Sequence, residues 1–197
     1  MKLNFLEIGT SDFDTLIESA NDDTIGISIE PLKYYLDKLP NKKNVIKLNC
    51  AVSFDDEEHE EYIYYIPEDI IKKHRLPYLW RGCNSIGDYH YWHKKKNAAQ
   101  YCIKEKVRMI PLSKIIEQYN ITSIDLLKID TEGMDCKILQ SFHKSVLLNK
   151  SQSFWPKKIH FESNYLTPDE TIVSTIKLFE QSGYKSDRRE KDTTLML

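Results

Sequence analysis

The sequence predicts an α/β fold with a mostly parallel, twisted sheet flanked by helices. Short apolar runs alternate with segments whose apolar residues recur every three or four positions, which is the pattern of strands joined by crossover helices. The chain has 197 residues, of which 41% are hydrophobic and 29% are charged. That length and that balance suit one buried core, so we expect a single domain over residues 1–197.

The first quarter of the chain contains three expected strands and two expected helices. The strands cover residues 3–8, 25–30 and 45–49. Between the first two strands, Ser11 is the expected N-cap of a helix and Asp14 takes the capping-box position. The apolar face of that helix is formed by Phe13, Leu16, Ile17 and Ala20. The helix after the second strand presents Leu32, Leu36 and Leu39.

The last third of the chain continues the alternation. A helix with the apolar residues Leu112, Ile115, Ile116 and Tyr119 precedes a buried strand at residues 125–130. Another helix follows Gly133, and the next strand covers residues 159–162. The run Thr167-Pro168-Asp169-Glu170 is typical of a helix start, and Gly183 ends that helix. Residues 193–197 supply a final strand, which we expect at the edge of the sheet.

One segment does not fit this alternation. About 75 residues separate Asn49 from Asp125, far more than a single crossover helix needs. In an open α/β sheet such extra elements gather over the carboxyl ends of the strands, where ligands bind. We therefore expect an insert, at about residues 54–110 between the third and fourth strands, that selects the substrate.

Composition excludes several classes of protein. No apolar run approaches the roughly 18 residues of a membrane span, and the N-terminus lacks the features of a signal peptide, so we expect a cytoplasmic protein. The four cysteines form no C-x-x-C pair, which argues against a disulfide framework or a zinc knuckle. The net charge of −2 gives no basic field for nucleic acid, so that partner is not expected.

Glu7, Gly9 and Glu30 form a candidate nucleoside site. Gly9 lies in the turn after the first strand, where a glycine lets the backbone approach a ligand that faces helix N–H groups. Glu7 precedes it by two residues. Glu30 follows it by 21 residues at the end of the second strand, where a carboxylate can accept both ribose hydroxyls. This arrangement is typical of methyltransferases that use S-adenosylmethionine.

A nicotinamide dinucleotide is the alternative ligand, because Glu30 serves it equally well. However, Ser11 and Asp14 occupy the second and third glycine positions of the G-x-G-x-x-G pattern. Asp12 and Asp14 are also expected in the first helical turn, where they would repel a pyrophosphate. S-adenosylmethionine has no phosphate and carries a sulfonium and an ammonium, which carboxylates suit. The sequence favours the methyl donor.

Residues 128–135, Lys-Ile-Asp-Thr-Glu-Gly-Met-Asp, resemble the K-I-D-x-E-G-x-E run of the FkbM family of methyltransferases. Leu6-Glu7-Ile8-Gly9, Ile29-Glu30-Pro31 and Ile159-His160-Phe161-Glu162 extend the resemblance over most of the chain. It implies a Rossmann-like class I methyltransferase fold, S-adenosylmethionine as the cofactor, and methylation of hydroxyl oxygens, often on sugars or glycosides.

The sequence departs from this family in three ways. Ser11, Asp12 and Phe13 stand where the family has small residues and a further glycine, and Asp135 replaces its second glutamate. Most members also carry helices before the first strand, which here begins almost at Met1. This suggests a domain of a longer polypeptide, such as a viral methyltransferase module fused to glycosyltransferases, which would act in the host cytoplasm.

The expected site contains residues that bind the cofactor and residues that take part in catalysis. The residues expected to bind the cofactor are Glu7, Gly9, Thr10, Ser11, Glu30, Pro31, Asn49, Cys50, Ala51 and Asp130. Asp130 and Glu162 end adjacent strands, and we expect Asp130 to be the catalytic base, helped by Glu162 and His160. Asp130 and Glu162 can instead hold a divalent cation that lowers the pKa of the acceptor hydroxyl. Glu132 is either catalytic or stabilises the dipole of the following helix, and His160 is either a site residue or a core histidine.

The aromatic side chains of the insert are the expected acceptor site. They belong to the set Trp80, Arg81, Tyr89, His90, Tyr91, Trp92 and His93. Rings with polar edges suit the apolar faces and hydroxyls of a sugar, although the same rings can form a small core under a long loop. His90 and His93 have the spacing of a metal pair but lack further ligands nearby.

The sequence therefore predicts an O-methyltransferase that acts on a sugar or glycan hydroxyl. Two alternatives stay open. One is an RNA ribose 2′-O-methyltransferase, in which bases stack on Tyr89, Tyr91 and Trp92 while Lys94-Lys95-Lys96 contacts phosphate. The other is a non-catalytic nucleotide-binding module, which would bind cofactor without turnover.

Overall fold

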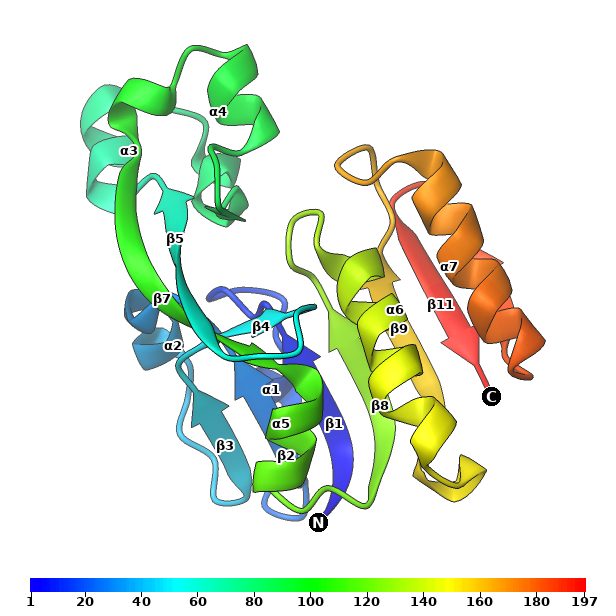
Figure 1. Cartoon of the computed structure of the whole chain (residues 1–197). Helices are drawn as coiled ribbons and strands as arrows, with labels where there is room; N and C mark the ends of the chain where they lie inside the picture. The colour runs from blue at the N-terminus through cyan, green and yellow to red at the C-terminus, as the bar shows by residue number, and fades with distance from the viewer.

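The computed structural model describes all 197 residues and contains a large sheet of seven strands (Figure 1). The strand order is β10-β11-β9-β8-β1-β2-β3. The bounds are β1 Lys2–Ile8, β2 Gly26–Ile29, β3 Val45–Leu48, β8 Ser123–Ile129, β9 Lys158–Glu162, β10 Lys185–Arg188 and β11 Asp192–Met196. The five neighbouring strands β9, β8, β1, β2 and β3 pair in parallel. β11 is antiparallel to both of its neighbours, β9 and β10. This confirms the predicted Rossmann-like α/β fold.

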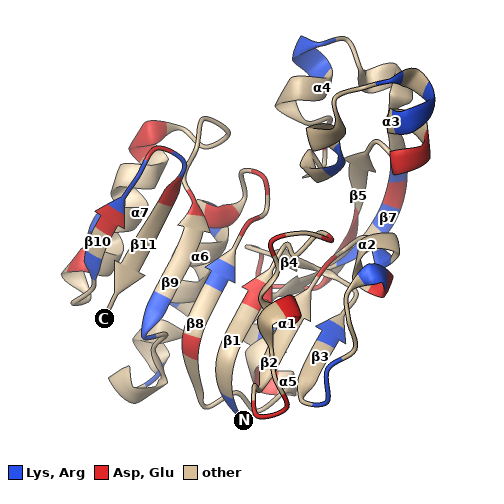
Figure 2. Cartoon of the chain, turned by 180° about the vertical axis from the view of Figure 1, so that it is seen from behind, with Lys and Arg blue, Asp and Glu red and all other residues tan.

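Helices cover both faces of the sheet. Their bounds are α1 Leu16–Ser19, α2 Lys33–Lys38, α5 Leu112–Gln118, α6 Asp135–Ser145 and α7 Asp169–Gln181, with the 3-10 turns η3 Leu147–Asn149 and η4 Gln152–Phe154 after α6. Helices α5, α6 and α7 pack on one face (Figure 1), and α1 and α2 pack on the other, as the view from behind shows (Figure 2). The main core is a cluster of 29 buried residues beneath α5, α6 and α7. No helix combines the length and the apolar character needed to cross a membrane.

The first helix is shorter than predicted. Ser11 and Asp14 have φ angles of +49° and +55°, so the chain turns through a left-handed loop before α1 begins. The N-cap of α1 is Thr15, and no side chain caps this helix, so the prediction of a Ser11 cap was wrong. Asp12 and Asp14 therefore lie outside the first helical turn, which removes one argument against a pyrophosphate. The missing G-x-G-x-x-G pattern still stands.

The final strand is not at the edge. β11 lies between β9 and β10, and β10 forms the edge of the sheet. The sequence pattern missed β10 because all four of its residues are exposed and polar, so it has no buried face to detect.

The predicted insert, together with β4 just before it, forms a second sheet in the order β4-β7-β5-β6. Its strands are β4 Ala51–Ser53, β5 His59–Tyr65, β6 Ser85–Ile86 and β7 Ile103–Pro111, and its helices are α3 Glu68–His74, η1 Tyr78–Gly82, α4 Tyr91–Lys95 and η2 Ala99–Tyr101. The long β5 and β7 strands carry α3 and α4 beyond the carboxyl ends of the main strands (Figure 1). The insert therefore stands where ligands bind in open α/β sheets.

Candidate functional site

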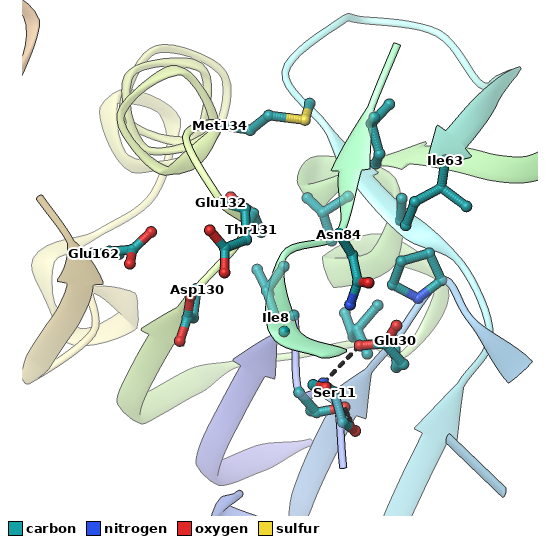
Figure 3. A pocket seen from close by; sticks show the side chains of 18 of the residues that line it. Ile8, Ser11, Glu30, Ile63, Asn84, Asp130, Thr131, Glu132, Met134 and Glu162 are labelled. Atoms are coloured by element: carbon teal, nitrogen blue, oxygen red, sulfur yellow. Dashed lines mark hydrogen bonds between the residues drawn. The ribbon is translucent and has the colours of Figure 1, made fainter. Parts of the chain in front are cut away.

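A cavity of about 430 Å³ lies between the carboxyl ends of the central strands and the insert. Figure 3 shows side chains of the sheet and of the insert around it. Ten of the residues predicted from the sequence line it, namely Gly9, Thr10, Ser11, Glu30, Pro31, Cys50, Ala51, Asp130, Glu132 and Glu162. The topology brings them together because parallel strands end at the same edge of the sheet.

Gly9 allows the ends of β1 and β8 to approach each other closely. Its φ is +79°, and a Cβ atom there would lie 1.8 Å from the carbonyl oxygen of Asp130. The N–H groups of Gly9 and Thr10 both donate to the carbonyl oxygen of Ile29, at 3.0 and 3.3 Å, so the turn is also fixed to β2. No other residue combines this backbone angle with this lack of volume.

Glu30 is buried at one end of the cavity. Its carboxylate accepts the backbone N–H of Ser11 at 2.7 Å and that of Leu32 at 2.9 Å. Burial raises the pKa of Glu30 to about 7, against the effect of these two hydrogen bonds. The left-handed turn at Ser11 is what directs its N–H toward this carboxylate. We call Glu30, Ser11 and their surroundings the nucleoside end of the cavity.

Three carboxyl groups meet at the other end. Asp130 opens to the cavity, and Glu132 and Glu162 are partly buried beside it. Burial raises the pKa of Glu132 to about 8 and that of Glu162 to about 9, and the neighbouring carboxylates act in the same direction. Partial desolvation also raises the pKa of Asp130. We call these three residues the acidic end.

Asp135 holds the acidic end in place. It is fully buried, and its carboxylate accepts the Thr131 hydroxyl at 2.9 Å. It also accepts the backbone N–H groups of Thr131 and Gly133 at 3.4 Å and of Glu162 at 3.3 Å. One carboxylate therefore ties the loop after β8 to the end of β9.

Glu132 is also held by the insert. Nδ1 of His90 accepts the backbone N–H of Trp92 at 3.3 Å, so Nε2 carries the ring proton and donates to Glu132 at 3.1 Å. Burial lowers the pKa of His90 to about 4, which keeps its ring neutral. Glu132 has a φ of +54° and precedes α6 in the loop, and this contact gives it a partner other than the helix dipole.

Three predicted site residues do not reach the cavity. Glu7 is fully buried, where its carboxylate accepts the N–H of Leu16 and the ammonium of Lys128, each at 3.0 Å. Asn49 donates to the carbonyl oxygens of Glu30 and Pro31, and His160 is hydrogen-bonded to Thr194 at 3.0 Å. These residues support the site from outside it.

The aromatic set of the insert does not line the cavity either. This holds for Trp80, Arg81, Tyr89, His90, Tyr91, Trp92 and His93. The insert side chains that do line it were missed, and they include Ile63, Leu79, Cys83, Asn84 and Ile86. They follow no aromatic or charged pattern, so the sequence offered no signal for them.

The structure shows no metal centre at the histidine pair or at the acidic end. No group of three or more His, Cys, Asp or Glu side chains is placed to hold a metal ion. His93 contacts the thiol of Cys102 at 3.3 Å instead of sharing a ligand with His90.

Comparison with known proteins agrees with this geometry. The model of the methyltransferase FkbM domain matches residues 6–186, which include the insert sheet, the parallel strands of the main sheet and both ends of the cavity. No curated protein sequence matches the chain. The chain belongs to the FkbM family, and it is a methyltransferase.

Proposed function

We propose that this methyltransferase transfers a methyl group from S-adenosylmethionine to a hydroxyl oxygen of a sugar or glycan. The observation that carries the proposal is the shape of the cavity, which joins a buried ribose-type carboxylate, Glu30, to a cluster of three carboxyl groups. A nucleoside with a cationic tail matches a site of this kind from end to end.

The residues present fit this cofactor. Glu30 retains lone pairs toward the cavity, since each of its oxygens accepts only one hydrogen bond from the chain. Ser11 Oγ and Glu162 Oε2, one at each end, are buried and have no partner in the chain. Lys128 lines the cavity, but its ammonium is bound by Glu7 and by the carbonyl oxygen of Asp14. The cofactor supplies a methyl group that is electrophilic because it is bonded to a positively charged sulfur.

The acidic end supplies the base. A pKa of about 9 means that Glu162 carries its proton at neutral pH, which limits the repulsion among the three carboxyl groups. Asp130 then acts as the carboxylate that accepts the proton of the acceptor hydroxyl. The hydrogen bond from His90 orients Glu132 beside Asp130. Positioning of the acceptor oxygen and removal of its proton are the two contributions that methyl transfer to an alcohol needs.

An aromatic cluster near the acidic end supports a sugar acceptor. Tyr165, in the loop after β9, is 58% exposed, and its ring centroid lies 5.4 Å from that of Tyr91 and 5.9 Å from that of Trp92. Tyr91 and Trp92 directly follow His90, whose Nε2 donates to Glu132 at 3.1 Å, so this cluster lies beside the acidic end. Exposed rings with polar edges suit the faces of a sugar.

A methylation screen tests the acceptor class. Short glycans and capped RNA are offered with labelled S-adenosylmethionine, at low and high salt, with and without EDTA. We expect methylation of a glycan hydroxyl with a weak dependence on salt, and loss of most turnover in Tyr165→Ala. Methylation of RNA that falls steeply with salt would contradict the sugar assignment and favour a ribose 2′-hydroxyl. The EDTA arm reports whether a divalent cation takes part.

A further inference from the structure

Asn84 brings a buried and unpaired oxygen to the cavity. This residue lies between η1 and β6, and its side chain lines the cavity wall that the insert provides. Its Oδ1 atom is buried and accepts no hydrogen bond from the chain. A buried amide oxygen that loses its hydration without a new partner is unfavourable and rare in proteins. A hydrogen-bond donor on a ligand is the partner that the site lacks.

The position of Asn84 indicates which part of a ligand it meets. Figure 3 shows its side chain extending from the insert toward the part of the cavity where Glu30 and Ser11 lie. Ser11 Oγ is another buried atom without a partner at this end. The acidic end is formed by different elements, the loop after β8 and the end of β9. Asn84 therefore belongs to the nucleoside end.

The segment before Asn84 is anchored to the loop after β1. The guanidinium of Arg81 lies 3.2 Å from the carboxylate of Asp12, which Lys38 also contacts at 2.8 Å. The same guanidinium lies 4.3 Å from the centre of the Phe13 ring. Gly82 packs so tightly on this ring that a Cβ atom would lie 2.9 Å from it. Asp12 and Phe13, which depart from the family pattern, thus contact Arg81 and Gly82 and hold this part of the insert against the loop after β1.

The segment after Asn84 is fixed as well. β6 begins at Ser85, which is paired with Tyr64 in β5. Asn84 lies between this pairing and the Arg81 anchor, so its backbone is fixed before a ligand arrives. Preorganisation of this kind increases affinity, because little conformational freedom remains to be lost on binding.

We propose that Asn84 is a cofactor-binding residue contributed by the insert. Its Oδ1 accepts a hydrogen bond from a neutral donor of the nucleoside, either a ribose hydroxyl or the exocyclic amine of adenine. The proposal rests on the proposed use of S-adenosylmethionine. It gives the insert a role in binding the methyl donor in addition to the role in acceptor selection.

The test is calorimetric titration of the wild-type chain and of Asn84→Leu, an apolar variant of similar size. The probes are S-adenosylhomocysteine, its 2′-deoxy and 3′-deoxy forms, and S-inosylhomocysteine, which lacks the adenine amine. Gln100→Ala, an exposed substitution in the insert away from the cavity, is the matched control. Asn84→Ala is titrated as well, in case leucine disturbs the fold.

We expect Asn84→Leu to bind S-adenosylhomocysteine about tenfold more weakly than the wild type, and Gln100→Ala to bind it equally well. One analogue should bind the wild type about tenfold more weakly than S-adenosylhomocysteine does, but should bind Asn84→Leu as well as S-adenosylhomocysteine does. That analogue lacks the group that donates to Asn84. Equal affinity of wild type and both Asn84 variants would overturn the inference. The inference would also be overturned if the substitution weakened the binding of S-adenosylhomocysteine and of every analogue by the same factor. If the wild type binds none of the probes, the proposed function itself fails.

Discussion

Replacing Asp130 by asparagine should lower kcat by at least about 100-fold, because an amide cannot accept the proton of the acceptor hydroxyl. Binding of S-adenosylhomocysteine should weaken much less, by about tenfold at most, since the variant loses only the charge of this side chain, keeps its shape, and keeps the backbone N–H of residue 130 that donates to Ile8. The measurement combines single-turnover methylation with calorimetric titration. A loss of kcat that clearly exceeds the loss of affinity places the residue in the chemical step.

Asp125→Asn is the matched control for this experiment. Asp125 lies near the start of β8, the strand that Asp130 directly follows, and it forms an ion pair with Lys157 at 2.7 Å. It should retain full kcat. Full activity in Asp130→Asn would remove Asp130 as the base and would direct attention to Glu132.

The substitution Gly9→Ala should destabilise the protein by about 3 kcal/mol or more. A positive φ costs an alanine about 1–2 kcal/mol, and the overlap with the carbonyl oxygen of Asp130 adds a similar amount, because the ends of β1 and β8 must separate. Chemical denaturation measures the free energy of unfolding. The same variant should lose affinity for S-adenosylhomocysteine, since the displaced loop carries Ser11.

Gly87→Ala separates the two costs. Gly87 has a φ of +82°, almost the same as Gly9, but a Cβ atom there meets nothing within 4 Å. It should therefore lose only about 1–2 kcal/mol from the backbone angle. If Gly9→Ala and Gly87→Ala have the same free energy of unfolding, the close approach of β1 and β8 is not what requires glycine at position 9.

The sheet and the strand-end residues could be predicted from the sequence. Apolar runs of strand length located β1, β2, β3, β8 and β9, and parallel pairing then brought Gly9, Glu30 and Asp130 to one edge. The roles of Glu7 and Asn49 could not be predicted in this way. Both lie next to site residues in the sequence, but their side chains form other hydrogen bonds. Glu7 accepts the backbone N–H of Leu16 and the ammonium of Lys128, and Asn49 donates to the carbonyl oxygen of Glu30.

The insert is the part of the site whose lining residues the sequence pattern indicated least well. Its aromatic residues suggested a binding surface, yet His90 is buried against Glu132, and Trp80 packs edge-on against His93. Asn84 carries no local pattern at all. Its position depends on the contact of Arg81 with Asp12, residues 69 positions apart in the sequence, and no periodicity encodes such a pair.

The central claim is that this cavity binds S-adenosylmethionine. Calorimetric titration of the wild-type chain with S-adenosylhomocysteine, beside a parallel titration with NAD, tests it most directly. We expect one molecule of S-adenosylhomocysteine to bind per chain, no heat from NAD, and a clear loss of affinity in Glu30→Ala. Saturable binding of NAD, or no binding of S-adenosylhomocysteine, would contradict the account.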